Sequence, residues 1–164
     1  TREVAGSQDS IGIAMPGLNR ANYAGHYWPE SIESVHDEAV FQWLENCLYL
    51  VTLGPRTNDY NVLADTRISE AGARELSEAA DGCWKAILNR DIQAFGQQFR
   101  RSFEAQIAMF PNMVDGSIFD MIEEYRHQAL GWKLSGAGGG GYQILVSETP
   151  VEKAIQVKIR RRDD

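Results

Sequence analysis

The sequence has few of the residues on which several classes of protein depend. Its 164 residues include two cysteines and three histidines. Cys47 and Cys83 lie far apart in apolar surroundings, whereas a disulfide framework needs more cysteines and a zinc site needs ligands at closer spacing. The histidines show no metal-ligand spacing either. We therefore predict two reduced, buried thiols and no metal site.

Long apolar runs and an excess of positive charge are also lacking. The longest apolar run, Leu48-Tyr49-Leu50-Val51, is far too short to span a bilayer. Sixteen basic residues stand against 23 acidic ones, which gives a net charge of −7 and disfavours nucleic-acid binding. The basic cluster 160–162 is followed at once by two aspartates, as is typical of a solvated strand end. We expect a cytoplasmic protein that binds neither nucleic acid nor a membrane.

Hydrophobic periodicity predicts an α+β fold. Apolar or alternating runs predict four strands, at 48–53, 132–134, 142–147 and 154–160. Apolar residues that recur every three or four positions predict helices at 38–46, 69–88, 91–110 and 117–129. Ser69 and Asp91 are the expected N-caps of two of these helices. We predict an antiparallel sheet of about four strands with the helices packed on one face.

The first 30 residues give weaker signals. The small residues of 6–14 predict one or two helical turns that begin at Ser7 or Asp9, and 18–23 alternates weakly, as a strand does. Tyr27 and Trp28 lie in a predicted turn. These two aromatics and Tyr23 either flank a bound substrate or pack in the core or at its rim.

The run Gly136-Ala137-Gly138-Gly139-Gly140-Gly141 is the least ordinary feature of the sequence. It contains G-x-G-x-x-G, but too few residues follow Gly141 for the βαβ unit that a dinucleotide site needs, and no Gly-Lys-Ser/Thr follows for a Walker loop. What remains is a strand, a glycine loop and a strand. Such a loop suits an anion site built from successive N–H groups, close backbone packing, or a flexible hairpin. The residues alone leave these three alternatives open.

The stretch Lys133-Leu134-Ser135 followed by the glycine run and Tyr142 resembles the third, C-terminal motif of the GHMP kinases. That family covers galactose, homoserine, mevalonate and phosphomevalonate kinases, with fucose and heptose-phosphate kinases among its relatives. The resemblance implies a ferredoxin-like C-terminal kinase domain. It also implies that the loop lies beside the phosphates of ATP, and the implied residues are Ser135, Gly136, Ala137, Gly138, Gly139, Gly140 and Gly141.

A second segment, Gly6–Gly12 followed by Met15-Pro16-Gly17, is similar to the surroundings of the catalytic aspartate in the fucose and heptose-phosphate branch. By this resemblance Asp9 draws the proton from the sugar hydroxyl during phosphoryl transfer. A helix N-cap is the alternative role for Asp9. Gln8 and Tyr23 are possible substrate contacts.

A weaker likeness is Leu53-Gly54-Pro55-Arg56, because related kinases often have a glycine and a nearby arginine after the corresponding strand. Arg56 either contacts substrate or phosphate or closes a loop ion pair. The residues that follow it, Thr57-Asn58-Asp59, depart from the small residues usual in the family.

The family's nucleotide loop, Pro-x-x-x-Gly-Leu-Gly-Ser-Ser, has no counterpart here, and the chain begins at Thr1. We expect 1–25 to be the tail of an N-terminal kinase domain and 26–164 the C-terminal domain of a longer sugar kinase that uses ATP and Mg²⁺. The fragment alone is expected to bind neither tightly and to be inactive. Its partners would be a sugar or sugar-phosphate substrate and the missing N-terminal domain. A non-catalytic interaction module with the same fold, or a kinase of the family for a non-sugar alcohol, are the alternatives.

Overall fold

The computed structural model describes residues 6–56 and 60–162, which divide into two compact units. The first contains 6–42 and 158–162, and the second contains 43–157 without the undescribed residues 57–59. This division differs from the predicted boundary after residue 25. The assignment of 1–25 to an N-terminal kinase domain stays a prediction, and residues 1–5 lie outside the described part.

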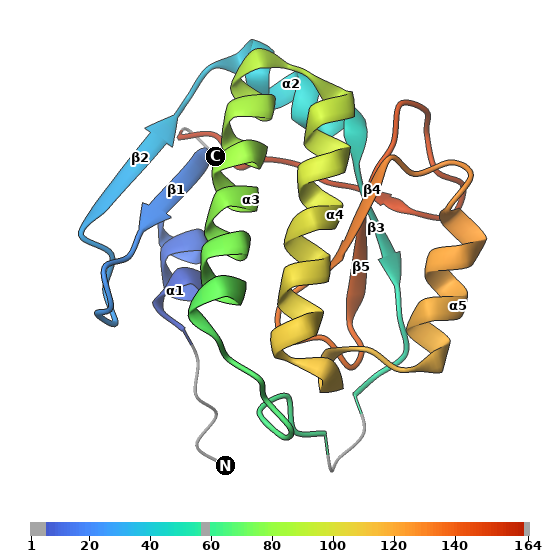
Figure 1. The fold of residues 1–164 in the computed structure, drawn as a ribbon. Coiled ribbons are helices and arrows are strands. Elements are labelled where there is room, and N and C mark those ends of the chain that lie inside the picture. Colours follow the sequence, from blue (N-terminus) through green and yellow to red (C-terminus); the bar gives the residue numbers. More distant parts are fainter. Residues whose placement is uncertain (1–5, 57–59, 163–164) are drawn as a thin grey trace. The chain divides into compact units, whose positions relative to one another are not determined.

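The first unit holds helix α1 (Ser7–Ala14) and an antiparallel hairpin of β1 (Leu18–Asn22) and β2 (Ser31–Val35) (Figure 1). Strand β1 agrees with the prediction, whereas β2 was not predicted. Only Ile32 and Val35 of β2 are half-buried and its other side chains are exposed, so the sequence carries no alternating apolar signal there. Helix α2 (Glu38–Cys47) begins in this unit and ends in the second.

The second unit is built on a four-stranded antiparallel sheet with the order β4-β5-β3-β6, which confirms the predicted fold class. Its strands are β3 (Leu48–Thr52), β4 (Gly131–Leu134), β5 (Tyr142–Val146) and β6 (Ile155–Gln156). Pairing places Tyr49 opposite Leu145 and Leu145 opposite Trp132, so these side chains share one face of the sheet.

Three helices belong to the same unit: α3 (Glu70–Asn89), α4 (Ile92–Met109) and α5 (Gly116–Tyr125), with a short 3₁₀ turn, η1 (Pro111–Met113), between the last two. The predicted caps are confirmed, since Ser69 accepts from the Gly72 N–H and Asp91 from the Ala94 N–H. No helix in the described part combines the length and apolarity that a membrane crossing requires.

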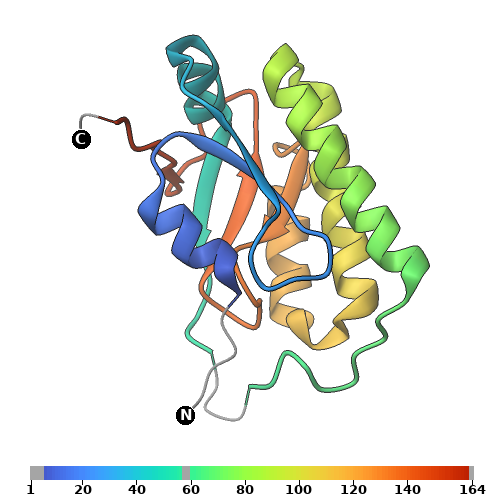
Figure 2. The same cartoon turned by 90° about the vertical axis from the view of Figure 1, so that its left-hand side faces the viewer.

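The core of the second unit lies between one face of the sheet and α4 and α5. Leu134 and Leu145 of the sheet pack in one cluster with Phe103 of α4 and with Ile118 and Ile122 of α5, all of them buried. Figures 1 and 2 show both helices on the same side of the sheet. This confirms the prediction that the helices cover one face.

Helix α4 and the start of β4 approach each other unusually closely. A β-carbon on Gly131 would lie 2.4 Å from the Gly96 carbonyl oxygen, and one on Gly96 would lie 2.6 Å from Cβ of Leu130. The missing side chains therefore allow the helix and the strand to touch through their backbones.

Two predicted elements end earlier than expected. The predicted strand 154–160 is paired only at Ile155 and Gln156, with one further bond from the Val157 N–H to Leu48. Leu48 is the first residue of β3 and directly follows helix α2, so residues 158–160 have no further β3 residue with which to pair. Helix α5 ends at Tyr125 rather than Ala129, because the Gln128 and Ala129 N–H groups both turn back to the Tyr125 carbonyl.

Candidate functional site

The glycine loop, residues 136–141, joins β4 to β5. The Ser135 N–H donates to the Tyr142 carbonyl at 2.9 Å and closes the base of the loop. All of its glycines have positive φ angles, from 66° at Gly139 to 145° at Gly140. A side chain is disfavoured in this region of backbone space, so the loop conformation itself requires glycine.

Space around the loop is as restricted as its backbone angles. A β-carbon on Gly138 would lie 2.5 Å from the Met113 carbonyl oxygen, and one on Gly139 would lie 2.1 Å from a ring carbon of Tyr60. The loop is therefore packed against its surroundings rather than free as a hairpin. Close packing, one of the three alternatives left open by the sequence, is a role that these contacts show.

Backbone hydrogen bonds occupy only part of the loop. The Gly139 N–H donates to Met113 at 2.9 Å, and the Gly141 N–H donates to Gly54 at 3.1 Å. Four other N–H groups of the loop have no acceptor within 6–56 and 60–162. They are those of Gly136, Ala137, Gly138 and Gly140. These four donors are the ones that an anion can use.

Arg56 is an exposed residue whose guanidinium rests on the loop. Its Nε donates to the Gly138 carbonyl at 2.8 Å, and its Nη2 would lie 3.7 Å from a β-carbon on Gly136. In the described part of the chain its terminal Nη groups meet no acceptor. The loop ion pair proposed as an alternative is not found among these residues, and Thr57-Asn58-Asp59 lie outside them.

Tyr60 is a residue of the site that the sequence did not indicate. Its hydroxyl donates to the Ala137 carbonyl at 2.5 Å, and the Arg56 guanidinium carbon lies 5.7 Å from the ring centre. Burial raises the pKa of Tyr60, an effect that the Arg56 charge opposes. The hydroxyl is therefore protonated at neutral pH and acts as a donor.

A hollow of about 220 Å³ lies against Gly139 and Gly140 of the loop, beside the end of β3 and the first turns of α5. It contains Asp115, whose carboxylate accepts from the Ser117 hydroxyl at 2.6 Å and the Ile118 N–H at 3.1 Å. These two bonds hold the pKa of Asp115 below its usual value, so the carboxylate is charged. Its charge disfavours a phosphate close to Asp115 in this hollow.

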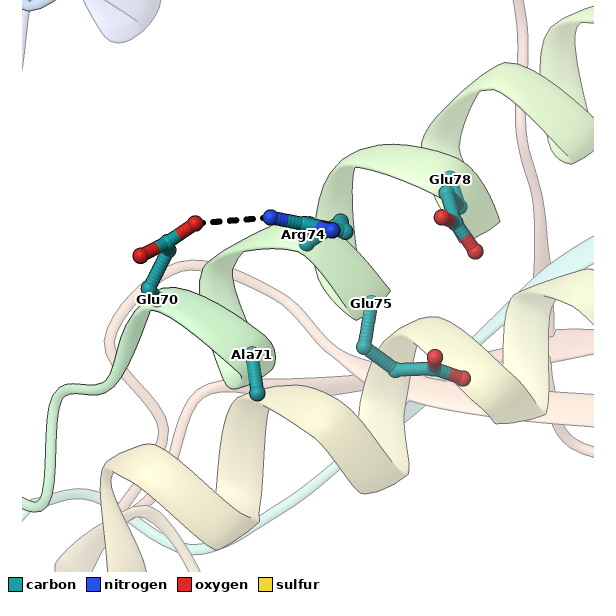
Figure 3. Close-up of a pocket in the computed structure, with 5 residues that line it drawn as sticks. All are labelled: Glu70, Ala71, Arg74, Glu75 and Glu78. Atoms are coloured by element: carbon teal, nitrogen blue, oxygen red, sulfur yellow. Dashed lines mark hydrogen bonds and ion pairs between the residues drawn. The ribbon is translucent and has the colours of Figure 1, made fainter.

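A larger hollow, of about 400 Å³, runs along α3 and is lined by Glu70, Ala71, Arg74, Glu75 and Glu78 (Figure 3). Arg74 pairs with Glu70 at 2.6 Å, and Arg101 of α4 pairs with both Glu75 and Glu78. Each charged side chain that lines this hollow is thus paired within the described residues, so the hollow presents no unpaired cation to a phosphate. Nowhere in the described residues do three His, Cys, Asp or Glu side chains gather as a metal site would need.

Lys133, which opens the resemblance motif, does not point to the glycine loop. Its ammonium group donates to Ser102 at 3.1 Å and to Gln106 at 2.5 Å, both on α4. Burial lowers the pKa of Lys133 to about 8. The side chain thus joins the sheet to α4 and does not contact the loop donors.

Both cysteines are free thiols, as predicted. Cys47 is buried and Cys83 is half-buried, and burial raises the pKa of the two thiols to about 12 and about 11. They are protonated and unreactive at neutral pH.

Asp9, the predicted catalytic residue, lies in the first turn of α1 in the first unit. Its side chain and that of Gln8 are exposed. The helix begins at Ser7, one of the two predicted starts, but its N-cap is Gly6 and no side chain caps it, so the alternative role of Asp9 as an N-cap is wrong. The catalytic assignment of Asp9 stays a prediction.

Ser7 instead ties α1 to the β1–β2 connection. Its side chain is buried, and its hydroxyl bonds with the Tyr23 hydroxyl at 2.9 Å and donates to the Tyr27 carbonyl. The aromatic rings themselves are outside the core: Tyr23, Tyr27 and Trp28 are 44%, 58% and 59% exposed. Core packing is thereby excluded for all three, whereas packing at the rim and substrate contact both stay predictions.

The fold of this chain is similar to that of two kinases of known structure. Mevalonate kinase matches with a TM-score of 0.60 at 18% identity, over 80% of this chain and 46% of that one. D-glycero-D-manno-heptose 1-phosphate kinase from Bacteriodes thetaiotaomicron matches with a TM-score of 0.52 at 13% identity, over 80% and 40%. No protein-family model matches the sequence, and no curated protein does. The chain has the fold of a GHMP kinase C-terminal-like domain and spans less than half the length of either kinase.

Proposed function

We propose that this chain is the C-terminal part of an ATP-dependent kinase of the GHMP type, which phosphorylates a hydroxyl of a monosaccharide or sugar phosphate. The observation that carries the proposal is the Arg56 guanidinium on the glycine loop. Its Nε is used to hold Gly138, while its Nη groups face no acceptor in the described part of the chain. A guanidinium beside free backbone N–H groups is a donor set suited to phosphate.

The two named kinases support the chemistry, since both are kinases and one acts on a heptose phosphate. Fold alone does not define a reaction. The sugar branch rests on the resemblance around Gln8 and Asp9, and a kinase for a non-sugar alcohol would share the same loop. A substrate screen of the full-length kinase with sugars, sugar phosphates and mevalonate separates these possibilities.

In this proposal the residues of the chain have distinct roles. Arg56 and the loop N–H groups hold a phosphate group, whose negative charge they neutralise. Asp9 draws the proton from the acceptor hydroxyl as the phosphoryl group arrives. ATP supplies that phosphoryl group, and the family's nucleotide loop, which would position it, has no counterpart in this sequence. We therefore expect no transfer by the 164-residue chain alone.

The phosphate site is tested by titrating the chain with inorganic pyrophosphate in a calorimeter. We expect binding, and we expect Arg56→Ala to weaken it by about ten- to a hundredfold, the value of one or two charge-assisted hydrogen bonds. Arg74→Ala is the control, because Arg74 is another exposed arginine and its guanidinium pairs with Glu70 at 2.6 Å. Equal affinities for wild type and Arg56→Ala would contradict the proposed site.

The catalytic role is tested in the full-length kinase with Asp9→Asn. We expect turnover to fall by about 10²- to 10⁴-fold, as general-base losses do, while ATP affinity stays unchanged. Asp120→Asn, at an exposed position of α5, is the control. Wild-type turnover in Asp9→Asn would exclude Asp9 as a catalytic residue.

A non-catalytic interaction module is the second candidate. It is favoured by the contacts of Gly138 and Gly139 with Met113 and Tyr60, which explain those glycines by packing alone. A chain that binds no pyrophosphate, from a parent that phosphorylates no alcohol, would support this candidate over the kinase.

A further inference from the structure

Tyr60 makes three separate contacts around the glycine loop although it lies 77 residues from Ala137. Its hydroxyl bonds to the Ala137 carbonyl, its ring fills the space beside Gly139, and the Arg56 guanidinium lies over its face. No other side chain in the described residues both bonds to the loop backbone and supports the arginine of the candidate site.

The bond to Ala137 orients one peptide group of the loop. The chain has no cis peptide bonds in its described part, so the carbonyl of Ala137 and the N–H of Gly138 point in opposite directions. When the Tyr60 hydroxyl holds the carbonyl, it also directs the Gly138 N–H away from itself. That N–H donates to no protein group within 6–56 and 60–162.

The next peptide group is held in a different way, and the contrast is informative. The Gly138 carbonyl accepts from Arg56 Nε, and the opposite end of this peptide, the Gly139 N–H, donates to Met113. Both ends are therefore bonded within the protein. In the Ala137–Gly138 peptide only the carbonyl is bonded to a described residue, and the N–H is left as an oriented donor.

We propose that Tyr60 is a positioning residue of the phosphate site: its hydroxyl fixes the Ala137–Gly138 peptide so that the Gly138 N–H donates to a bound phosphate group, while its ring supports Arg56. This inference rests on the proposed function. It adds that the affinity of the loop for phosphate depends on a side chain that does not touch the phosphate. Preorganising the donor in this way avoids an ordering cost on binding.

The test compares Tyr60→Phe with Tyr49→Phe. Both variants remove one hydroxyl that donates to a backbone carbonyl, Ala137 for Tyr60 and Asn46 for Tyr49, and both keep the ring. Tyr49 lies near the start of β3. The backbone bonds to the glycine loop are made by Leu53 and Gly54, which follow the opposite end of this strand. A general effect of losing one hydrogen bond would therefore appear in both variants. An effect that comes from the geometry of the loop would appear in Tyr60→Phe alone.

We expect Tyr60→Phe to bind inorganic pyrophosphate about three- to tenfold more weakly than wild type, and Tyr49→Phe to bind it with unchanged affinity. In ¹H–¹⁵N spectra, pyrophosphate should shift the Gly138 amide resonance in wild type and shift it less in Tyr60→Phe. Unchanged affinity in Tyr60→Phe, or equal weakening in both variants, overturns the role of Tyr60. If wild type itself binds no pyrophosphate, the proposed phosphate site fails, and the role of Tyr60 fails with it.

Discussion

Gly139→Ala is the substitution for which the structure predicts a large loss of stability from a single methyl group. The new β-carbon would lie 2.1, 2.4 and 2.5 Å from three ring atoms of Tyr60, far inside ordinary contact distance. The ring must therefore move, and its hydroxyl then loses Ala137. The positive φ of 66° adds a backbone cost of its own.

The magnitude follows from these three terms. Placing alanine at a positive φ costs about 1–2 kcal/mol, overpacking adds about 1–3 kcal/mol, and the lost hydrogen bond adds about 1 kcal/mol, with partial relaxation of the ring offsetting some of the sum. We expect a loss of about 2–4 kcal/mol in the free energy of unfolding. The measurement is urea unfolding followed by tryptophan fluorescence, since Trp132 lies in the core of the same unit.

Gly141→Ala is the matched control in the same loop. Gly141 also has a positive φ, 86°, but a β-carbon there would meet nothing within 4 Å. It should show only the backbone cost of about 1–2 kcal/mol. In a Tyr60→Ala background, the loss of stability caused by Gly139→Ala should fall to the same value, because the obstructing ring is gone. The reasoning is refuted if Gly141→Ala costs as much as Gly139→Ala, or if removal of Tyr60 leaves the cost of Gly139→Ala unchanged.

Two further predictions concern the packing of α4. Gly96→Ala should lower the free energy of unfolding in urea by about 1–3 kcal/mol despite the better helix propensity of alanine, because its β-carbon would lie 2.6 Å from Leu130. Gly116→Ala is the control, since its β-carbon meets nothing within 4 Å, and it should stabilise the protein by up to about 1 kcal/mol. The same sign for both variants would contradict the close contact of α4 with β4. Lys133 has a folded pKa of about 8, below its ordinary 10.5, so the unfolded chain binds more protons between these values and stability should rise with pH across that window. Compared with Lys133→Met, wild type should gain about 3 kcal/mol from pH 8 to pH 10.5 in unfolding titrations, and parallel pH profiles would show that Lys133 is not desolvated.

The regular part of the fold was predictable because its signals are local. The apolar residues of α4 recur at helical spacing, its ends carry Asp91 and Pro111, and β3 is a continuous apolar run. Strand β2 and the true length of β6 were not predictable. Each depends on which backbone lies beside it, and pairing partners leave little trace in the sequence of an exposed edge.

The site divides in the same way. The glycine loop was found from the run of glycines in the sequence, and Arg56 from a resemblance to related kinases, which often have a glycine and a nearby arginine after the corresponding strand. Tyr60 and Ser7 were missed, because each acts through a long-range contact with a backbone carbonyl, Ala137 for Tyr60 and Tyr27 for Ser7. A backbone carbonyl is offered by every residue, so no residue type or spacing marks the partner.

The sequence by itself determined the α+β class, the N-caps Ser69 and Asp91 and the presence of a loop in which five glycines relax the limits on φ, because these follow from the chemistry of neighbouring residues. Only the tertiary structure decided what the loop touches. It placed Arg56 on the carbonyl of Gly138, 82 residues away in sequence, and turned Lys133 toward α4, although Lys133 adjoins the glycine motif in sequence. Side-chain direction across a sheet and contacts between segments some 80 residues apart depend on packing, which no local pattern encodes.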